Sequence, residues 1–227
     1  LNMAVVETER HGQIFVVRLN RPERLNALGF EIRSLLADAW SEFRESSDLE
    51  VGVFTGAGRA FCAGGDVKRF AAVSSGGQKT VAFEDRVHDL RSRMEVSRLL
   101  HEMPKPTLAV IPGPAAGAGL SLALACDLRI AAKDAKLTTA FSKVGLSGDF
   151  GGSYFLTYLV GVAKARELYF TGRVLLGQEA LELGIVNRVA TADHLEQEAH
   201  SYAAELAALP TLAVGYMKKN LNAALKG

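Results

Sequence analysis

The chain has 227 residues, which suits one large domain, and 48% of them are hydrophobic against 22% that are charged. This balance supports a sizeable core and argues against wholesale disorder. The 26 basic and 25 acidic side chains leave a formal net charge of +1, so the charge gives no reason to expect nucleic acid or a membrane surface as a partner.

Strand patterns and helix patterns alternate along the chain. A β-branched strand at 13–20 is followed by a helix at 29–47, in which Trp40 lies on the stripe expected to face the core. Two further apolar strands are predicted at 49–57 and 105–113. The remaining predicted elements are helices at 81–103, 151–172, 194–209 and 211–225, a small-residue helix within 114–127, a short strand and turn within 128–140, and a strand-like segment at 185–189. This alternation is typical of an α/β domain with ligand-facing turns at its strand ends.

The two cysteines, Cys62 and Cys126, lack the spacing of metal ligands and stand among small or apolar residues. Both are expected to be buried thiols, which indicates a reducing, cytoplasmic location. The opening residues contain no basic segment followed by an apolar one, so no secretory signal is expected. The longest apolar stretches are much shorter than the roughly 20 residues of a membrane span.

Two turns made of small residues, AFCAGGD (60–66) and AAGAGLS (115–121), are the first candidates for chemistry. Small side chains let a ligand approach the backbone closely, and the first N–H groups of a helix are unpaired. Two such turns facing each other can hold one oxygen between two N–H donors, which is an oxyanion hole. Tight packing of a helix on a strand needs the same small residues, so the pattern by itself leaves both interpretations open.

Five segments of the chain closely resemble the crotonase superfamily, the enoyl-CoA hydratases and isomerases, in order and at the family's spacings. They are LNRPERLNAL, FCAGGD, KPTLAVIPGPAAGAGLSLALACDLRIAAKDAKL, GGSYFL and TGRVLLGQEALELGIVNRV. The resemblance implies an α/β fold, a ClpP/crotonase-like spiral of ββα units with C-terminal helices. It divides the chain into a core with the CoA-binding site at 1–190 and a C-terminal helical oligomerisation region at 191–227, which looks short for the family.

The resemblance also implies a ligand and a set of site residues. Family members bind acyl-CoA thioesters and form trimers or hexamers, so we expect an acyl-CoA substrate, a homo-oligomer, no metal and no cofactor beyond the coenzyme A of the substrate. By motif position, Ala63 and Ala118 supply the two N–H donors for the thioester oxygen. Arg24 would approach the CoA phosphates or adenine, with an exposed loop charge as the alternative. The other implied CoA-binding residues are Ala27, Ala63, Gly64, Gly65 and Asp66.

The chain departs from the family's hydratases at two positions. Hydration needs one carboxylate to activate water and another to supply a proton. At the positions of the two hydratase glutamates this sequence has Ser121 and Phe141. Neither residue can act as an acid or base at neutral pH, so ordinary hydration is not expected.

One carboxylate remains in a turn that should face the acyl group, Asp149 in GLSGDFGG (145–152). Here the sequence resembles the phenylacetate-pathway enoyl-CoA isomerases, which implies double-bond isomerisation. A single carboxylate suits that reaction, because one group can remove a proton and return it elsewhere. The neighbours Phe141, Leu146 and Phe150 should raise the pKa of Asp149 by excluding water.

Other interpretations stay open from the sequence. Asp149 could cap the helix expected near Gly151, a role worth about 1 kcal/mol, or attack as a nucleophile, as in the superfamily's aryl-CoA dehalogenases. The dehalogenases pair that aspartate with a tryptophan, and Phe141 stands at its position. The chain could also be a hydratase in name alone or a non-catalytic acyl-CoA binder. RNA binding, a role found in the superfamily, is disfavoured by the near-neutral charge.

Overall fold

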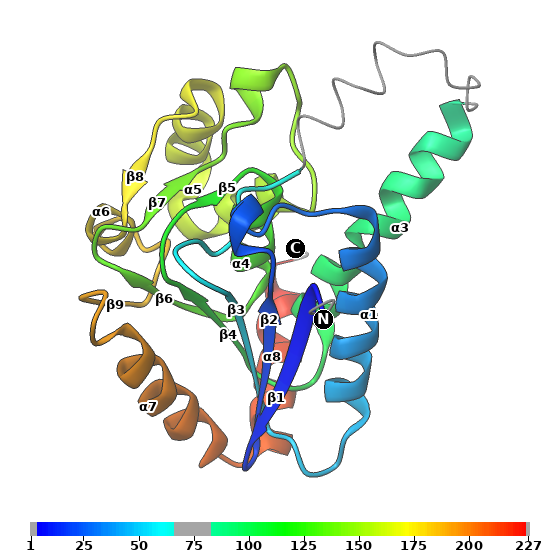
Figure 1. The fold of residues 1–227 in the computed structure, drawn as a ribbon, viewed down its shortest axis with the longest axis vertical. Helices are drawn as coiled ribbons and strands as arrows, with labels where there is room; N and C mark the ends of the chain where they lie inside the picture. The colour runs from blue at the N-terminus through cyan, green and yellow to red at the C-terminus, as the bar shows by residue number, and fades with distance from the viewer. Residues whose placement is uncertain (1–3, 66–82, 226–227) are drawn as a thin grey trace.

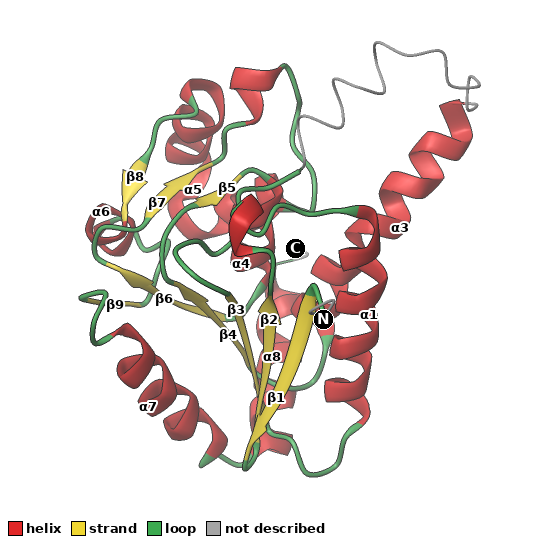
Figure 2. Cartoon of the chain, in the orientation of Figure 1, coloured by secondary structure: helices red, strands yellow, loops and turns green. Residues whose placement is uncertain are grey.

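The computed structural model describes residues 4–65 and 83–225. Two β-sheets lie at the centre of the molecule, and helices pack around them (Figures 1 and 2). The long alternation of strand and helix patterns in the sequence is therefore realised as the predicted α/β architecture. The buried apolar side chains form one continuous core that includes residues from both sheets and from the helices around them.

The larger sheet has six strands: β1 (Val6–His11), β2 (Ile14–Leu19), β3 (Val51–Gly56), β4 (Thr107–Ile111), β6 (Leu128–Ala132) and β9 (Arg188–Ala190). They lie in the order β1-β2-β3-β4-β6-β9. β1 and β2 are antiparallel, and every other neighbouring pair is parallel. β4 is buried along its whole length, as its uninterrupted apolar sequence predicts for a strand covered on both faces.

The smaller sheet has three short strands: β5 (Ala115–Ala116), β7 (Lys136–Thr138) and β8 (Leu175–Leu176). The chain passes from a strand of the larger sheet to a strand of the smaller sheet and then into a helix. β4, β5 and α4 (Ala118–Ala125) form one such unit, and β6, β7 and α5 (Gly152–Thr171) form another. After β3, an isolated bridge between Cys62 and Ala115 attaches the chain to the edge of the smaller sheet. This repetition is the predicted spiral of ββα units.

The remaining helices cover the sheets. They are α1 (Phe30–Glu45), α3 (Phe83–Glu102), α6 (Gly177–Glu182), α7 (Leu195–Ala207) and α8 (Thr211–Ala224), with 3-10 turns η1 (Pro22–Arg24) and η2 (Phe141–Val144). α7 packs across the strands of the larger sheet, while α1 lies beside β1, β2 and α3 (Figure 1). Trp40 of α1 is fully buried and meets Phe43 and Phe54 edge-on, which confirms its predicted place in the core.

The buried ammonium group of Lys218 anchors helix α8 to the core. The Nζ of Lys218 donates to Asp127 Oδ2 at 2.8 Å and to the carbonyl oxygen of Leu100 at 2.8 Å. The same carboxylate oxygen accepts hydrogen bonds from the N–H and hydroxyl of Thr107. Asp127 lies two residues after the end of α4, so this network ties the C-terminal helix to the segment that carries the second small-residue turn.

Two local features differ from the sequence predictions. β1 was not expected, because its sequence VETERH is polar and its side chains are half-buried or exposed at the sheet edge. Hydrogen bonding to β2 through a tight turn, rather than an apolar face, makes it a strand. The predicted helix at 151–172 is interrupted at Gly161, whose φ of 75° and ψ of 163° are not helical.

The prediction that both cysteines are buried thiols is confirmed. Cys62 and Cys126 are free and buried, and burial raises the pKa of each thiol to about 12. Thiols of this kind are not nucleophilic near neutral pH. Within 4–65 and 83–225, no helix has the length and apolar character that crossing a membrane requires, and no three His, Cys, Asp or Glu side chains gather as metal ligands.

Candidate active site

The first small-residue turn is held in place by a loop that precedes α1. Asn26 is completely buried, and its side-chain amide donates to the carbonyl oxygens of Ala57 and Ala60 at 3.0 and 2.8 Å. Its Oδ1 accepts the N–H of Arg21 at 2.9 Å. Asn26 therefore joins the loop at 21–27 to the turn at 57–63. Sequence reasoning missed this residue, although it lies within the LNRPERLNAL segment.

The same junction determines which N–H groups of the first turn are bonded internally. The Ala63 N–H donates to the carbonyl oxygen of Leu25 at 2.9 Å, and Leu28 N–H donates to the carbonyl oxygen of Gly64 at 2.8 Å. The Ala63 N–H, which was predicted to donate to the thioester oxygen, is therefore already hydrogen-bonded to the anchored loop. Two residues further on, the N–H of Gly65 makes none of the backbone hydrogen bonds found between described residues.

The second turn leads into helix α4, which begins at Ala118 within the predicted helical segment 114–127, and the turn lies against the first turn. A Cβ placed on Gly119 would be 2.2 Å from the carbonyl oxygen of Cys62, so α4 approaches this backbone as closely as glycine allows. A Cβ on Gly64 would be 2.7 Å from the Ala116 carbonyl oxygen and 3.5 Å from the Ala118 nitrogen. Tight packing and the pairing of the two turns are thus one arrangement rather than competing explanations.

The Ala118 N–H has the geometry of a free helix-start donor. Ala118 is the first residue of α4, and the first N–H groups of a helix have no partner inside it. No backbone hydrogen bond between described residues uses this N–H. The carbonyl oxygen of the preceding residue, Gly117, accepts hydrogen bonds from the N–H and the hydroxyl group of Ser121.

Asp149 lies in the turn between η2 and α5. The N-cap of α5 is Gly151, and that cap makes no side-chain hydrogen bond. The Oδ1 atom of Asp149 is buried and has no hydrogen-bond partner among the residues that the structure describes. The carboxylate therefore does not act as the helix cap that the sequence left open; the backbone carbonyl of Asp149 accepts the N–H of Gly152 at 3.1 Å.

The surroundings of Asp149 favour its protonated form. Burial raises the pKa of its carboxyl group to about 6, while the nearby positive charge of Arg33 acts in the opposite direction. This confirms the predicted direction of the shift. Phe141 and Phe150 are buried at this turn, whereas Leu146 is 54% exposed and contributes less to the exclusion of water than expected.

Ser121, Phe141 and Tyr169 lie against the glycines of this turn, Gly148 and Gly152. Ser121 is buried in α4, and Phe141 begins η2 with its ring stacked on that of Tyr169, with the ring centroids 6.0 Å apart and the planes 11° apart. A Cβ on Gly152 would lie 2.2 Å from Ser121 Oγ and 2.6 Å from Tyr169 Oη. Sequence reasoning missed Tyr169, which lay inside a helical pattern with no motif to distinguish it.

The implied CoA-binding residues lie in two neighbouring segments. Arg24 is exposed at the end of η1, Ala27 is half-buried, and both belong to the loop anchored by Asn26. The Ala27 carbonyl oxygen accepts a hydrogen bond from the Arg21 side chain at 3.0 Å. The predicted CoA contact Asp66 lies outside the described residues.

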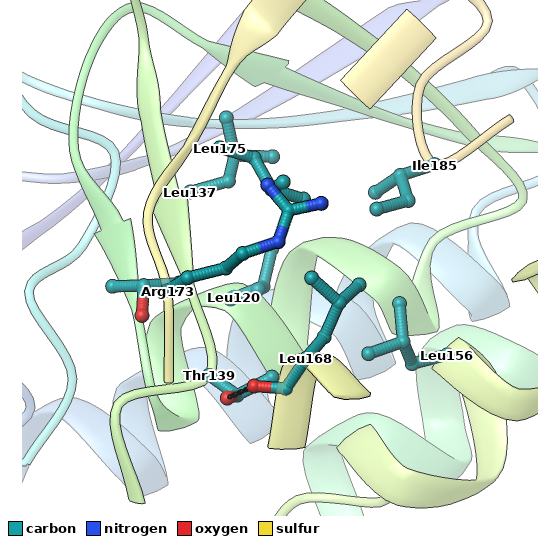
Figure 3. Close-up of a pocket in the computed structure, with 9 residues that line it drawn as sticks. Leu120, Leu137, Thr139, Leu156, Leu168, Arg173, Leu175 and Ile185 are labelled. Carbon is teal, nitrogen blue, oxygen red and sulfur yellow. Dashed lines mark hydrogen bonds between the residues drawn. The ribbon is translucent and has the colours of Figure 1, made fainter. Parts of the chain in front are cut away.

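A small pocket lies between α4, α5 and the smaller sheet. Its walls include Leu120 of α4, Leu168 of α5 and the side chain of Arg173 (Figure 3). The enclosed space is about 10 Å³, which is room for about one water molecule. None of the predicted site residues lines it, so it is a packing gap of the interior rather than a substrate site.

The site consists of two paired small-residue turns and a half-buried aspartate whose Oδ1 has no hydrogen-bond partner among the described residues. On a spiral of ββα units, these features define a class of enzyme site that can stabilise a developing oxyanion and move a proton. Comparison with known proteins gives the family. Residues 9–227 match the family described as enoyl-CoA hydratase/isomerase. The chain therefore belongs to the enoyl-CoA hydratase/isomerase family, as the sequence motifs indicated.

Individual relatives are similar along most of their length. The chain is 35% identical to the 1,2-epoxyphenylacetyl-CoA isomerase of Escherichia coli, a match that covers 93% of this chain and 79% of that protein. It is 36% identical to a probable enoyl-CoA hydratase of Mycobacterium tuberculosis, over 92% and 79% of the two chains. An enoyl-CoA hydratase structure from Polaromonas sp. JS666 superposes with a TM-score of 0.90 at 35% identity, covering 98% of this chain and 84% of that one.

Proposed function

We propose that this protein isomerises the double bond of an enoyl-CoA, with Asp149 as the single acid/base. The observation that carries the proposal is the buried Oδ1 of Asp149, which has no hydrogen-bond partner among the described residues, in a carboxyl group whose pKa is raised to about 6. A carboxyl group with a pKa near the working pH can both accept and return a proton. The name of the Escherichia coli relative, 1,2-epoxyphenylacetyl-CoA isomerase, supports isomerisation rather than hydration.

We further propose that the thioester oxygen lies between the N–H groups of Ala118 and Gly65. Both lie in the paired small-residue turns, and neither makes a backbone hydrogen bond between described residues. Gly65 replaces Ala63 in this role because the Ala63 N–H is bonded to Leu25. Two fixed N–H donors stabilise an oxygen most strongly where its negative charge develops, which is on the enolate formed during proton transfer.

The reaction can be written for a 3-enoyl-CoA. The Asp149 carboxylate removes a proton from C2, and the electron pair of the broken C–H bond moves through the thioester carbonyl to its oxygen. The resulting dienolate is held by the two N–H donors. The protonated Asp149 then returns the proton to C4, which leaves the double bond between C2 and C3. No water is added and no second carboxylate is needed.

The loop at 21–27 is proposed to contact the CoA portion. Arg24 is exposed on this loop, and Ala27 and Gly64 lie on the two segments that Asn26 joins. A guanidinium group suits phosphate oxygens because it presents several N–H donors in one plane. Arg24→Gln should therefore weaken acyl-CoA binding through KM and leave kcat nearly unchanged.

One experiment separates isomerase, hydratase and binder. The pure protein is incubated with 2-enoyl- and 3-enoyl-CoA esters, and products are followed by mass and ultraviolet absorbance. We expect conversion of one enoyl ester into the other at constant mass. Asp149→Asn should still bind acyl-CoA but isomerise at least about 100-fold more slowly, the low end for general acid–base catalysis.

Two outcomes would contradict the proposal. Addition of one water to crotonyl-CoA at a typical enzymatic rate of about 10 per second would make the chain a hydratase despite Ser121 and Phe141. Binding of every ester without any turnover would support the non-catalytic binder instead.

A further inference from the structure

Asn26 occupies a strained position in the loop that precedes α1. Leu25 and Asn26 have φ values of 49° and 56°, so two consecutive residues other than glycine lie in the left-handed region. This conformation costs energy and persists only where the surrounding structure holds it in place. The Asn26 side chain supplies that hold, because it is completely buried and makes hydrogen bonds with the backbone of Arg21, Ala57 and Ala60.

Two backbone hydrogen bonds join this loop to the first small-residue turn, one in each direction. The Leu25 carbonyl oxygen accepts the N–H of Ala63 at 2.9 Å, and the Leu28 N–H donates to the carbonyl oxygen of Gly64 at 2.8 Å. The two loop residues that make these bonds stand on either side of Asn26 in the chain. The side chain that fixes the loop therefore also fixes where both bonds are made.

The bond to Gly64 determines the direction of the next N–H group. Among the described residues no peptide bond is cis, and in a planar trans peptide the C=O and the N–H point in opposite directions. The carbonyl oxygen of Gly64 and the N–H of Gly65 belong to one such peptide. Because that oxygen is bonded to Leu28 of the loop, the Gly65 N–H points away from the loop, and it makes no backbone hydrogen bond between described residues.

Gly64 lies against the start of α4, where the other proposed donor is found. A Cβ on Gly64 would be 2.7 Å from the Ala116 carbonyl oxygen and 3.5 Å from the nitrogen of Ala118. The φ of Gly64 is 91°, a value that a residue with a side chain rarely adopts. The peptide between Gly64 and Gly65 is thus close to Ala118, and its orientation decides whether the two N–H groups can serve one oxygen.

We propose that Asn26 is a positioning residue for the oxyanion hole, which keeps the Gly65 N–H directed at the thioester oxygen by holding the loop at 21–28 against the turn at 57–65. The inference rests on the proposed function, because it takes Gly65 and Ala118 as the two donors. A fixed donor stabilises the enolate more than a mobile one, since it needs no reorganisation during the reaction. Loss of the Asn26 side chain should therefore lower kcat and leave acyl-CoA binding largely unchanged.

The test measures the hydrogen bonds to the thioester oxygen by infrared spectroscopy. The probe is butanoyl-CoA with an isotopic label at the thioester carbonyl carbon, which has no double bond to move. Its C=O stretching frequency falls as hydrogen bonds to the oxygen strengthen, so it should be lower in the wild-type complex than in water. Asn26→Gly accepts the left-handed backbone without strain and removes only the side chain. Its complex should lose most of the shift at a similar Kd, and its kcat for isomerisation should fall at least about tenfold, less than for a deleted donor.

Asn20→Gly is the matched control. The Asn20 amide also donates two hydrogen bonds, to the carbonyl oxygen of Ala4 at 3.2 Å and to Glu7 Oε1 at 2.6 Å, but neither acceptor belongs to the turn at 57–65. Its variant should keep the wild-type frequency shift and kcat. Asn26→Asp is a second test variant, which keeps the size and the acceptor oxygen but has no N–H to donate; it should lose the shift as Asn26→Gly does.

The inference is overturned if a folded Asn26 variant keeps the wild-type shift and kcat, whatever its KM, or if Asn20→Gly loses them equally. Failure of both Asn26 variants to fold would also overturn it, because Asn26 would then serve stability alone. A wild-type complex that binds butanoyl-CoA without any frequency shift would instead contradict the proposed pair of donors, and with it this inference.

Discussion

The carboxyl group of Asp149, in the turn before α5, lies within electrostatic reach of the guanidinium group of Arg33, on α1. Burial and the arginine act in opposite directions on this carboxyl group, and burial dominates, because the pKa is raised to about 6 from its ordinary value of 3.8. The pKa of Asp149 therefore depends on two elements that are far apart in the sequence, the turn before α5 and helix α1. This balance can be measured.

The pH dependence of isomerisation should report the pKa of Asp149. Proton removal needs the carboxylate form, so kcat/KM should rise with pH through about 6 and level off above it. Arg33→Met removes a charge that lowers the pKa, and its rising limb should move to higher pH. A limb that stays at the same pH in Arg33→Met would contradict the assignment of the titration to Asp149.

Asp149 should also leave a signature in stability. A raised pKa means that the folded state binds the proton more tightly than the unfolded state, so the stability of wild-type protein should fall as pH rises from about 4 to about 6. Asp149→Asn cannot ionise and should show a higher Tm than wild type at pH 7.5, with the difference shrinking at pH 4. Equal Tm values at both pH values would mean that the carboxylate is not effectively buried.

The N–H donor of Ala118 can be removed by itself. Proline is tolerated at the first position of a helix but carries no N–H, so Ala118→Pro should keep the fold and lose about 100- to 1,000-fold in kcat, the usual effect of deleting one oxyanion donor. Ala118→Gly, which keeps the N–H, is the control and should remain active. Steady-state kinetics on an enoyl-CoA measure both; full activity of the proline variant would exclude this donor.

Breaking the anchor of α8 should destabilise the fold. Lys218 is 7% exposed, and its Nζ bonds Asp127 and two carbonyl oxygens. Lys218→Met removes this donor from the two carbonyl oxygens and from Asp127, whose Oδ2 keeps its hydrogen bonds from Thr107. The variant should lower the free energy of unfolding by about 2 kcal/mol or more, short of the roughly 3–5 kcal/mol of fully buried pairs, because Asp127 also keeps some solvent contact. Urea denaturation measures the change, and Lys219→Met, at an exposed neighbour, should have little effect.

The exposed face of α8 should make the protein self-associate. Large apolar side chains gather there with 59–77% of their surface exposed: Leu212, Tyr216, Met217 and Leu221. An apolar patch of this kind marks an interaction surface, and the family resemblance indicates trimers or hexamers. Sedimentation at micromolar concentration should show an oligomer that the double variant Leu212→Glu/Leu221→Glu weakens. A monomeric wild-type protein would disprove the prediction.

The fold class, the buried cysteines and the two small-residue turns could all be predicted from the order of the amino acids. Each prediction follows from local features of the sequence: the periodicity of apolar residues, glycine and alanine at turns, and motifs that occur at the spacings of the family. The raised pKa of Asp149 was also within reach, because its apolar neighbours are adjacent in sequence. The edge strand β1 could not be predicted from the sequence, because its residues are polar and it becomes a strand only by pairing with β2.

Which side chains and backbone groups come into contact depends on how the separate elements pack in space. The hydrogen bond from Ala63 to Leu25 removes a donor that motif position had assigned, and it exists because Asn26 brings two separate loops together. Arg33 and Tyr169 lie in helical patterns that gave no sign of a site. The charge of Arg33 acts on Asp149, and the ring of Tyr169 stacks on Phe141 at the same turn. Both contacts arise because α1 and α5 pack against parts of the chain that are distant in sequence, and such interactions depend on distance in space.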